Sequence, residues 1–296
     1  MVSHGGLEGI VVDDAIVVEK LLKHYGKSRA INGISFSVSP GTIFGFLGPN
    51  GAGKTTTVKI LTCQMPPTSG TAHICGLDVM KNALAIKRKA GVVFESQNLY
   101  EEMTAADNLD FFRRLYGAEK KVVDEVLELT GMAEFKKKKV KTFSKGMKQK
   151  IMIARALVND PEVLFLDEPT SGLDPKSSRD IRQLIMGLKN KGKTILLTTH
   201  NMEEADALCD DLAFIYKGNI IARGTPKYLK KKYGNDVLKI ETLSGQTIEH
   251  PLNTESCSRA FSELSSSGDI LTVHSEEATL EDVFIELTGE RLSHEL

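Results

Sequence analysis

An eight-residue segment near the start of the chain has the composition of a phosphate-binding loop. It follows the pattern Gly-x-x-x-x-Gly-Lys-Thr and consists of Gly48, Pro49, Asn50, Gly51, Ala52, Gly53, Lys54 and Thr55. An apolar stretch of strand length, Thr42 to Leu47, precedes it, and the residues from Thr56 to Leu61 have a helical pattern. Because the motif has its required context between a strand and a helix, we predict a true P-loop rather than a chance glycine-rich turn.

The residue types in this loop suit a polyphosphate ligand. Gly51 and Gly53 tolerate positive φ angles, so successive backbone N–H groups can turn towards one anion. A helix that begins near Lys54 adds the positive end of its dipole. The Lys54 ammonium can reach the outer phosphates, and the Thr55 hydroxyl is placed to ligate the Mg²⁺ that bridges them.

Two further strands end in residues that can take part in phosphoryl transfer. The apolar run from Val163 ends in Asp167 and Glu168, and the run from Lys193 ends in His200. Buried parallel strands deliver their last residues to the ligand crevice. We expect Asp167 beside Mg²⁺, Glu168 as the base for the attacking water, and His200 as a hydrogen-bond partner of the γ-phosphate or that water. The alternatives are a helix N-cap for the carboxylates and a structural role for the histidine.

The composition argues against several classes of function. The 296 residues include 38 lysines and arginines and 39 aspartates and glutamates, so the net charge is −1 and no global attraction to nucleic acid is expected. Four distant cysteines without a Cys-x-x-Cys pair argue against zinc and disulfides and favour a reducing cytoplasm. No apolar run approaches the roughly 20 residues of a membrane helix, and the N-terminus lacks a signal pattern. We expect a soluble chain, with any membrane span supplied by another chain.

The pattern along the chain predicts a leader, a large domain and a small tail. The boundaries are residues 1–14 for the leader, 15–224 for the nucleotide domain with a helical subdomain at about 97–160, and 225–296 for the C-terminal domain. Three strands follow one another without an intervening helix, the third being the P-loop strand. They predict an antiparallel region beside the nucleotide core.

The tail has weaker patterns than the rest. Residues 228–233 are interpreted as a lysine-rich turn, and residues 237–240 and 270–273 as strands around a weak helix. Thr279 and Asp282 have the spacing of a capping pair for a last helix. No catalytic constellation is apparent in this part of the sequence.

Two surface features allow more than one interpretation. Tyr25, on the approach to the P-loop, is equally compatible with base stacking and with a half-buried strand end. The basic run Lys136 to Lys141 most simply forms a solvated face, and the alternative is a contact with anionic lipid.

The ordered set of motifs resembles that of the ATP-binding subunits of ABC transporters. The matching segments are Gly48 to Thr55 for Walker A, Phe143 to Met147 for the signature, Val163 to Glu168 for Walker B with the catalytic glutamate, Ser171 to Asp174 for the D-loop, and His200 for the switch histidine. The resemblance covers about residues 16–225.

This resemblance implies an α/β fold, a P-loop NTPase with an ABC-type core sheet, an N-terminal antiparallel β region, a helical signature subdomain and a small C-terminal α+β appendage. It implies ATP and Mg²⁺ as cofactors and ATP hydrolysis as the activity, with Glu168, His200 and Lys54 as catalytic residues. The implied nucleotide contacts are Tyr25 on the adenine, residues Gly48 to Thr56 on the phosphates, and Ser144, Gly146 and Asp174. The implied metal ligands are Thr55, Asp167 and Glu95.

Two departures from the family pattern affect these assignments. The usual Leu-Ser-Gly-Gly-Gln signature is Phe-Ser-Lys-Gly-Met here, which keeps Ser144 and Gly146 but changes the side chains around them. Where the family has a metal-sensing glutamine, Phe94 is followed by Glu95, and Gln97 lies two residues later. Either residue can take that role, and the register favours Glu95.

The resemblance also implies partners and a location. A second copy or a homologous ATPase chain would pack head to tail, so that each ATP lies between one P-loop and the other chain's signature. The tail, with its segment Leu280 to Phe284, is similar to that of subunits that drive export through a separate membrane permease. The chain would then be cytoplasmic and peripheral on the inner face of the cell membrane. The alternative is a soluble ABC ATPase that acts on ribosomes or DNA.

Overall fold

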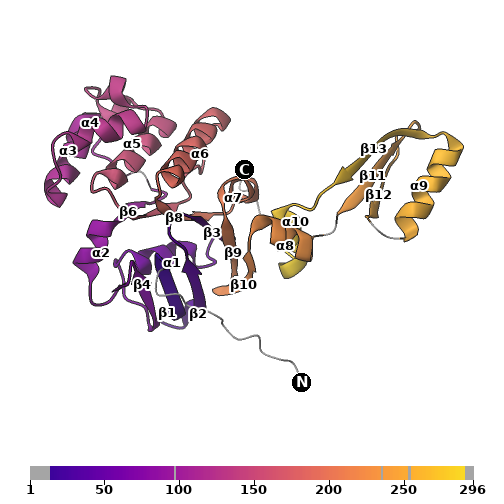
Figure 1. The fold of residues 1–296 in the computed structure, drawn as a ribbon, viewed down its shortest axis with the longest axis horizontal. Coiled ribbons are helices and arrows are strands. Elements are labelled where there is room, and N and C mark those ends of the chain that lie inside the picture. The colour runs from indigo at the N-terminus through magenta and orange to yellow at the C-terminus, as the bar shows by residue number, and fades with distance from the viewer. Residues whose placement is uncertain (1–13, 97, 235, 253–254, 291–296) are drawn as a thin grey trace. The chain divides into compact units, whose positions relative to one another are not determined.

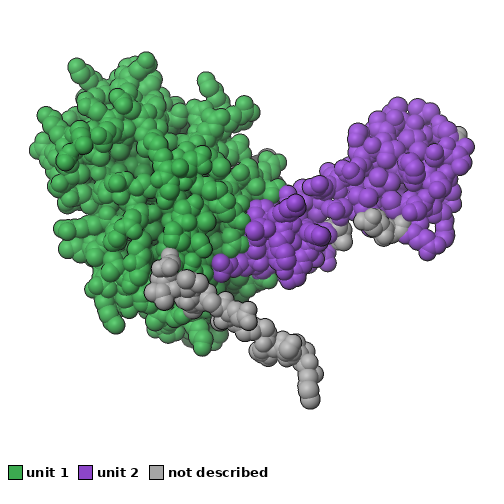
Figure 2. Space-filling model, viewed as in Figure 1, with its two compact units in different colours: residues 1–221 green, residues 222–296 purple. Residues whose placement is uncertain are grey.

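The computed structural model describes residues 14–96, 98–234, 236–252 and 255–290. The predicted leader, up to residue 13, and Gln97 therefore lie outside the described residues. Two compact units divide the chain, residues 1–221 and residues 222–296 (Figure 2). Within the described ranges, no helix is long and apolar enough to cross a membrane.

A six-stranded sheet has the order β10-β9-β3-β8-β7-β6, and all of its strands except the end of β10 belong to the first unit (Figure 1). Its strands are β3 (Ile43–Leu47), β6 (Ala90–Val93), β7 (Val163–Asp167), β8 (Thr194–Thr199), β9 (Asp211–Tyr216) and β10 (Asn219–Gly224). The strands from β9 to β6 in this order pair in parallel. Because β3, β8 and β7 are neighbours and run in one direction, the residues that follow them meet at one edge of the sheet.

A second, antiparallel sheet confirms the β region expected before the P-loop. Its order is β2-β1-β4-β5, with β1 (Ile16–Tyr25), β2 (Ser28–Val38), β4 (Ser69–Ile74) and β5 (Leu77–Asp78). The expectation was wrong in one respect, because the third successive strand, β3, belongs to the parallel sheet. The burial pattern gives the reason: β3 is buried at every position, as a central parallel strand must be, whereas the second half of β2 buries alternate residues.

Helix α1 (Lys54–Leu61) contacts strands of both sheets, namely β2, β4 and β7. The two sheets also meet through aromatic rings. Phe36 of β2 stacks on Phe44 and Phe46 of β3, with centroid distances of 5.3 and 5.4 Å. These contacts place the strand that leads into the P-loop in one buried core with the antiparallel sheet.

The remaining helices of the first unit pack on the parallel sheet or on one another. They are α2 (Ala83–Lys89), α3 (Ala105–Tyr116), α4 (Val122–Leu129), α5 (Lys145–Leu157), α6 (Pro175–Asn190) and α7 (Met202–Leu208), with single 3₁₀ turns at Ala133–Phe135 and Val140–Thr142. Helix α5, which begins with the signature residues, contacts α3, α4, α6 and β6. Thr104 and Asp107 form a capping box at the start of α3.

Acidic neighbours pair with several members of the basic run at 136–141. Lys139 and Lys141 contact Glu102, and Lys136 contacts Asp124. Backbone hydrogen bonds also join this run to the segment before α3, from Lys141 N to Glu101 O and from Ala105 N to Lys138 O. Exposed pairs of this kind are screened by water and contribute little to stability. Their positions favour a structural role on a solvated face, as the simpler interpretation expected.

The second unit consists of a helix pair and a small α+β layer. Helices α8 (Pro226–Tyr233) and α10 (Leu280–Thr288) contact each other. Strands β11 (Val237–Thr242), β12 (Thr247–Pro251) and β13 (Ile270–Glu276) form a sheet in the order β12-β11-β13, and helix α9 (Glu255–Ser267) contacts β12. The interpretation of residues 228–233 as a turn was wrong. Thr225 caps α8 by accepting a hydrogen bond from Tyr228 N, and Pro226 occupies the first helical turn. Thr followed by Pro is a helix start signal that the sequence itself contains. Strand β12 was not predicted.

A close approach between α5 and the sheet gives the first prediction. A Cβ atom on Gly91 of β6 would lie 2.3 Å from the Ala156 carbonyl oxygen and 2.7 Å from Leu164 Cδ2. The Gly91→Ala variant should therefore lose roughly 1–3 kcal/mol in free energy of unfolding, measured by urea denaturation. Gly187 of α6 has open space around its position, so Gly187→Ala should instead gain roughly 0.5–1 kcal/mol. Equal effects at both positions would contradict the close approach.

Candidate nucleotide site

The P-loop connects β3 to α1, as its motif requires, and packing explains two of its glycines. A Cβ atom on Gly48 would lie 2.1 Å from the Ile215 carbonyl oxygen. Gly53 has a φ of 113° and would bring a Cβ atom within 2.6 Å of the Ala30 carbonyl oxygen. The loop backbone is therefore pressed against β9 and β2, which leaves no room for larger residues at either position.

A pocket lies over this loop. Its lining residues are Ala30, Pro49, Asn50, Gly51, Gly53, Lys54, Thr55, Thr56, Glu95 and Glu168. Most of the phosphate contacts expected from the sequence therefore meet in one place, together with Glu95 and Glu168 from distant parts of the chain. Ala30 was not predicted, because a small residue in a strand carries no chemical signal of a binding site.

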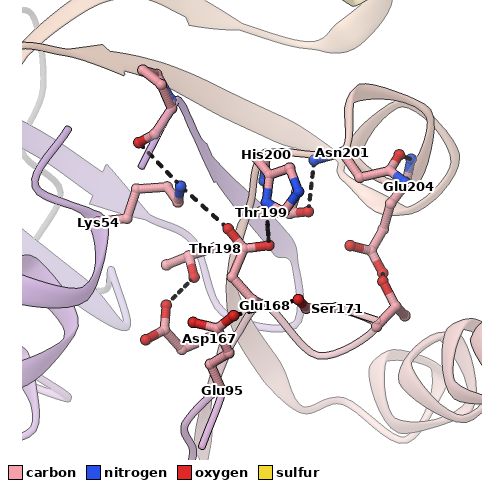
Figure 3. Close-up of polar contacts among 12 residues, drawn as sticks. Lys54, Glu95, Asp167, Glu168, Ser171, Thr198, Thr199, His200, Asn201 and Glu204 are labelled. Carbon is pink, nitrogen blue, oxygen red and sulfur yellow. Dashed lines mark hydrogen bonds and ion pairs between the residues drawn. The ribbon is translucent and has the colours of Figure 1, made fainter. Parts of the chain in front are cut away.

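Lys54 is buried and has three oxygen partners. Figure 3 shows its side chain directed towards Glu168. Its Nζ donates a hydrogen bond of 2.6 Å to the Gly48 carbonyl and one of 3.3 Å to the Pro49 carbonyl. The same ammonium lies 3.2 Å from Glu168 Oε1. A buried charge is costly without such partners, so these contacts set the position of the lysine.

Thr55 and Asp167 meet at the edge of this pocket. The Thr55 hydroxyl donates to Asp167 Oδ2 at 2.9 Å, and the Thr198 hydroxyl donates to Asp167 Oδ1. Asp167 is buried while Thr55 is exposed, so the pair lies at the boundary with solvent. Thr198 was not predicted as part of the site. The Thr-Thr-His ending of its strand was the available signal.

This pair of oxygens fits an Mg²⁺ site that is completed by a substrate. Mg²⁺ prefers oxygen ligands and is commonly held by one or two protein groups together with phosphate and water. In the described ranges, no group of three or more His, Cys, Asp and Glu side chains could hold a metal ion by itself. The donor set is thus of the kind that binds magnesium with a nucleotide.

Glu168 lies between Lys54 and His200 in a constrained conformation (Figure 3). Only 8% of the residue is exposed, and its φ of 50° is in the left-handed region that side chains disfavour. Its Oε2 lies 2.9 Å from His200 Nδ1, and the backbone N–H of His200 donates to the same oxygen at 3.4 Å. Conformations of this kind concentrate at functional sites.

The two partners also shift each other's ionisation. Burial opposes the charge of Glu168, but the hydrogen bond from His200 and the nearby Lys54 outweigh it, so the pKa of Glu168 lies below its ordinary value. The hydrogen bond to Glu168 raises the pKa of His200 despite partial burial. An ionised carboxylate beside an imidazole can accept a proton from water, which is the chemistry expected of this pair.

Glu95 follows β6 and reaches the same region. Its Oε1 accepts a hydrogen bond of 3.3 Å from the Ser171 hydroxyl. Glu95 therefore lines the pocket and also contacts the loop after Glu168. The competing residue, Gln97, lies outside the described residues, so the choice between them stays a prediction.

Four other predicted residues lie outside the pocket lining. Ser144 caps α5 by accepting from Met147 N at 3.2 Å, and Asp174 caps α6 by accepting from Ser177 N at 2.9 Å. A Cβ atom on Gly146 would lie 2.4 Å from Ser177 Oγ, so this glycine has a packing role within the chain. Tyr25 is 49% exposed at the end of β1.

Comparison with known proteins shows the family. The ABC transporter family model matches residues 31–171. A fluoroquinolones export ATP-binding protein of Mycobacterium tuberculosis is 38% identical over 286 residues, which cover 95% of each chain. A Nod factor export ATP-binding protein I of Ralstonia nicotianae is 37% identical, over 96% of this chain and 97% of that protein. The chain belongs to the ABC transporter family, as an ATP-binding and ATP-hydrolysing subunit.

Solved structures confirm the fold of this subunit. The cbiO1 protein of Clostridium perfringens, part of an ABC transporter complex, has a TM-score of 0.69 and 28% identity over 75% of this chain and 92% of its own. A dimeric ATP-binding cassette in a post-hydrolysis state with ADP and Pi has a TM-score of 0.65 and 27% identity, over 71% of this chain and 98% of its own. Both support the expected P-loop NTPase architecture.

The His200–Glu168 pair gives a prediction about pH. The pKa of His200 is raised above its ordinary 6.5, so its contribution to stability is complete below that pH and disappears as pH rises through the raised pKa. The pKa of Glu168 is lowered from 4.5, so its contribution is present above that pH and disappears as pH falls through the lowered pKa. Without added nucleotide, the melting-temperature difference between wild type and His200→Ala should be largest at about pH 5–6.

The same difference should shrink as pH rises through the raised pKa of His200 and the imidazolium is lost. Glu168→Gln removes the carboxylate from the pair. In that background, the His200→Ala substitution should change the melting temperature by an amount that does not depend on pH. A gap between wild type and His200→Ala that stays constant across this range would contradict the pairing.

Proposed function

We propose that this chain powers export through a separate membrane permease, by binding ATP between two copies and opening after hydrolysis. The observation that carries the proposal is the extent of the similarity to export ATP-binding proteins, which includes the tail as well as the ATPase domain. These names favour transport over a soluble role on ribosomes or DNA.

The proposed hydrolysis begins with an exchange of partners at Lys54. When polyphosphate occupies the loop, its oxygens compete with the Gly48 carbonyl and Glu168 for the ammonium. Glu168 is then free to orient a water and accept its proton as the water oxygen attacks the γ-phosphorus and ADP leaves. His200 holds the Glu168 carboxylate and donates to the transferred phosphoryl oxygens.

Thr55 and Asp167 are the residues that would hold Mg²⁺, with Glu95 beside them. The ion would neutralise charge on the β- and γ-phosphates. The Thr55–Asp167 hydrogen bond supports this assignment, because it places two suitable oxygens together at the pocket edge.

A second copy of this chain, or a homologous ATPase chain, is the proposed partner at the other side of the nucleotide. Ser144, Gly146 and Asp174 do not line the pocket of their own chain. This supports a role across an interface, where the Ser144 hydroxyl and the N-terminus of α5 would meet the γ-phosphate. Tyr25 would stack on the adenine, and its exposed ring is compatible with that role.

The proposed permease surface consists of exposed apolar side chains in the segment from Glu95 to Tyr116. They are Tyr100, Met103, Phe111, Leu115 and Tyr116. Tyr100 and Phe111 contact edge to face at a centroid distance of 5.4 Å, so the patch is partly pre-arranged. Arg155 of α5 donates to the Asn98 carbonyl and side chain, which links this region to the signature helix. The permease would hold the chain at the inner face of the membrane.

Glu168→Gln tests the hydrolytic mechanism. It should bind ATP but turn it over roughly 10²- to 10⁴-fold more slowly, because the amide cannot accept the proton. With ATP trapped, this variant should elute as a dimer in size-exclusion chromatography. Lys54→Ala is the matched control: it should weaken nucleotide binding itself, seen by titration. Rapid turnover by Glu168→Gln would refute the assigned base, and a monomer at saturating ATP would refute the dimer.

Alanine substitutions at Tyr100 and Met103 test the permease surface. Each substitution should weaken binding to the permease by more than about 1 kcal/mol, because large apolar side chains at the centre of an interface carry much of its binding energy. A polytopic membrane protein should therefore be recovered with the tagged chain in smaller amounts. ATP binding by the isolated chain should not change. Leu243→Ala, at an exposed apolar residue of the second unit, is the control. Undiminished recovery with both surface variants would exclude this patch as the docking site.

A further inference from the structure

One buried carboxyl group lies beside the proposed catalytic pair and has no role in the mechanism above. Glu204 is in the first turn of α7, four residues after His200, and only 1% of it is exposed. It lines a pocket together with Glu168, His200, Thr170 and other residues. Figure 3 shows its side chain directed towards the loop that carries Ser171.

Glu204 connects two segments that are far apart in the sequence. The Thr170 hydroxyl donates a hydrogen bond of 2.7 Å to Glu204 Oε1. The backbone N–H of Glu204 donates to Asn201 Oδ1 at 2.9 Å, and the N–H of Asn201 donates to Thr199 Oγ1 at 3.0 Å. One end of this chain of contacts is two residues after Glu168, and the other end includes both neighbours of His200.

Stability alone is a poor explanation for a carboxyl group at this position. No hydrogen bond to Glu204 Oε2 meets strict geometry among the described residues, although the Thr199 hydroxyl is close enough to act with Thr170 in lowering the pKa of this carboxyl group. Burial also raises the pKa of Glu204, because the charged form is disfavoured away from water. An apolar side chain of similar volume would fill the space without leaving a buried oxygen unpaired.

We propose that Glu204 is a positioning residue for ATP hydrolysis, which fixes the His200 segment against the loop from Thr170 to Asp174. Movement of that loop would then be transmitted to the histidine that holds Glu168. The inference rests on the roles proposed above for Glu168 and His200.

The test measures steady-state ATP turnover of the full chain with saturating magnesium and ATP. Glu204→Ala should lower kcat by about ten- to a hundredfold, because the catalytic pair loses its fixed geometry, while KM for ATP stays nearly unchanged. Glu204→Gln keeps the shape and one acceptor oxygen for Thr170, so it should restore most of the rate. Glu203→Ala, at the exposed neighbour on the same helix, should behave as wild type.

A second variant approaches the same contact from the other side. Thr170→Val removes only the hydroxyl, and it should lower kcat in the same direction even if Glu204→Ala fails to fold. In a His200→Ala background, Glu204→Ala should cause no further loss of kcat, since both changes disrupt the same group of interacting residues. Wild-type turnover in both Thr170→Val and Glu204→Ala, or a full additional loss in the His200→Ala background, would overturn the proposal.

These outcomes differ from a failure of the proposed mechanism. If Glu168→Gln and His200→Ala hydrolyse ATP at the wild-type rate, the catalytic assignments are wrong and Glu204 has no pair to position. If those two variants are inactive while Glu204→Ala and Thr170→Val are active, only the role of Glu204 is refuted.

Discussion

The arrangement of this site depends on a buried cation shared between a loop and a carboxylate. Lys54 holds the P-loop through the Gly48 carbonyl and contacts Glu168, which in turn contacts His200. Lys54 and Glu168 are buried, so each needs a charged or polar partner to offset the cost of burial, and His200 contacts the pair from a half-buried position. The same contacts explain how a polyphosphate could act as a switch, because a ligand that binds Lys54 must draw it from the residue assigned to activate water.

The parallel sheet is what brings these three groups together. Lys54 follows β3, Glu168 follows β7 and His200 follows β8, and β8 lies between the other two strands. Parallel pairing aligns Leu47 with Thr199 and Asp167 with Thr198, so the strand ends are level. A small change in this register would separate the lysine from the glutamate, since the contacts span only a few ångströms.

Packing beyond the sheet connects the site to surfaces where partners would bind. Gly91 allows α5 to lie against β6, and Arg155 joins α5 to the segment after Glu95. Ser171 contacts Glu95 on one side of its loop, while Thr170 contacts Glu204 on the other. Events at the nucleotide, the signature helix and the proposed permease surface are therefore linked by direct contacts within one unit. The second unit contributes none of these residues.

The sequence by itself determined the features that depend on neighbouring residues. The P-loop, the strand endings at Asp167 and His200, and the capping pair at Thr104 are all visible because their geometry requires particular residue types at short, fixed spacings. The family and the α/β fold followed from the order of those motifs. Even a local signal can be overlooked, as the Thr225–Pro226 start of α8 shows.

Only the tertiary structure decided which distant residues meet. The contacts of Thr198 with Asp167, of Glu95 with Ser171 and of Glu204 with Thr170 join residues 31 or more positions apart, and no spacing rule encodes them. The assignment of β3 to the parallel sheet likewise depended on its pairing with β8 and β9. Such distances are set by sheet order and helix packing, which are properties of the whole folded unit rather than of any segment.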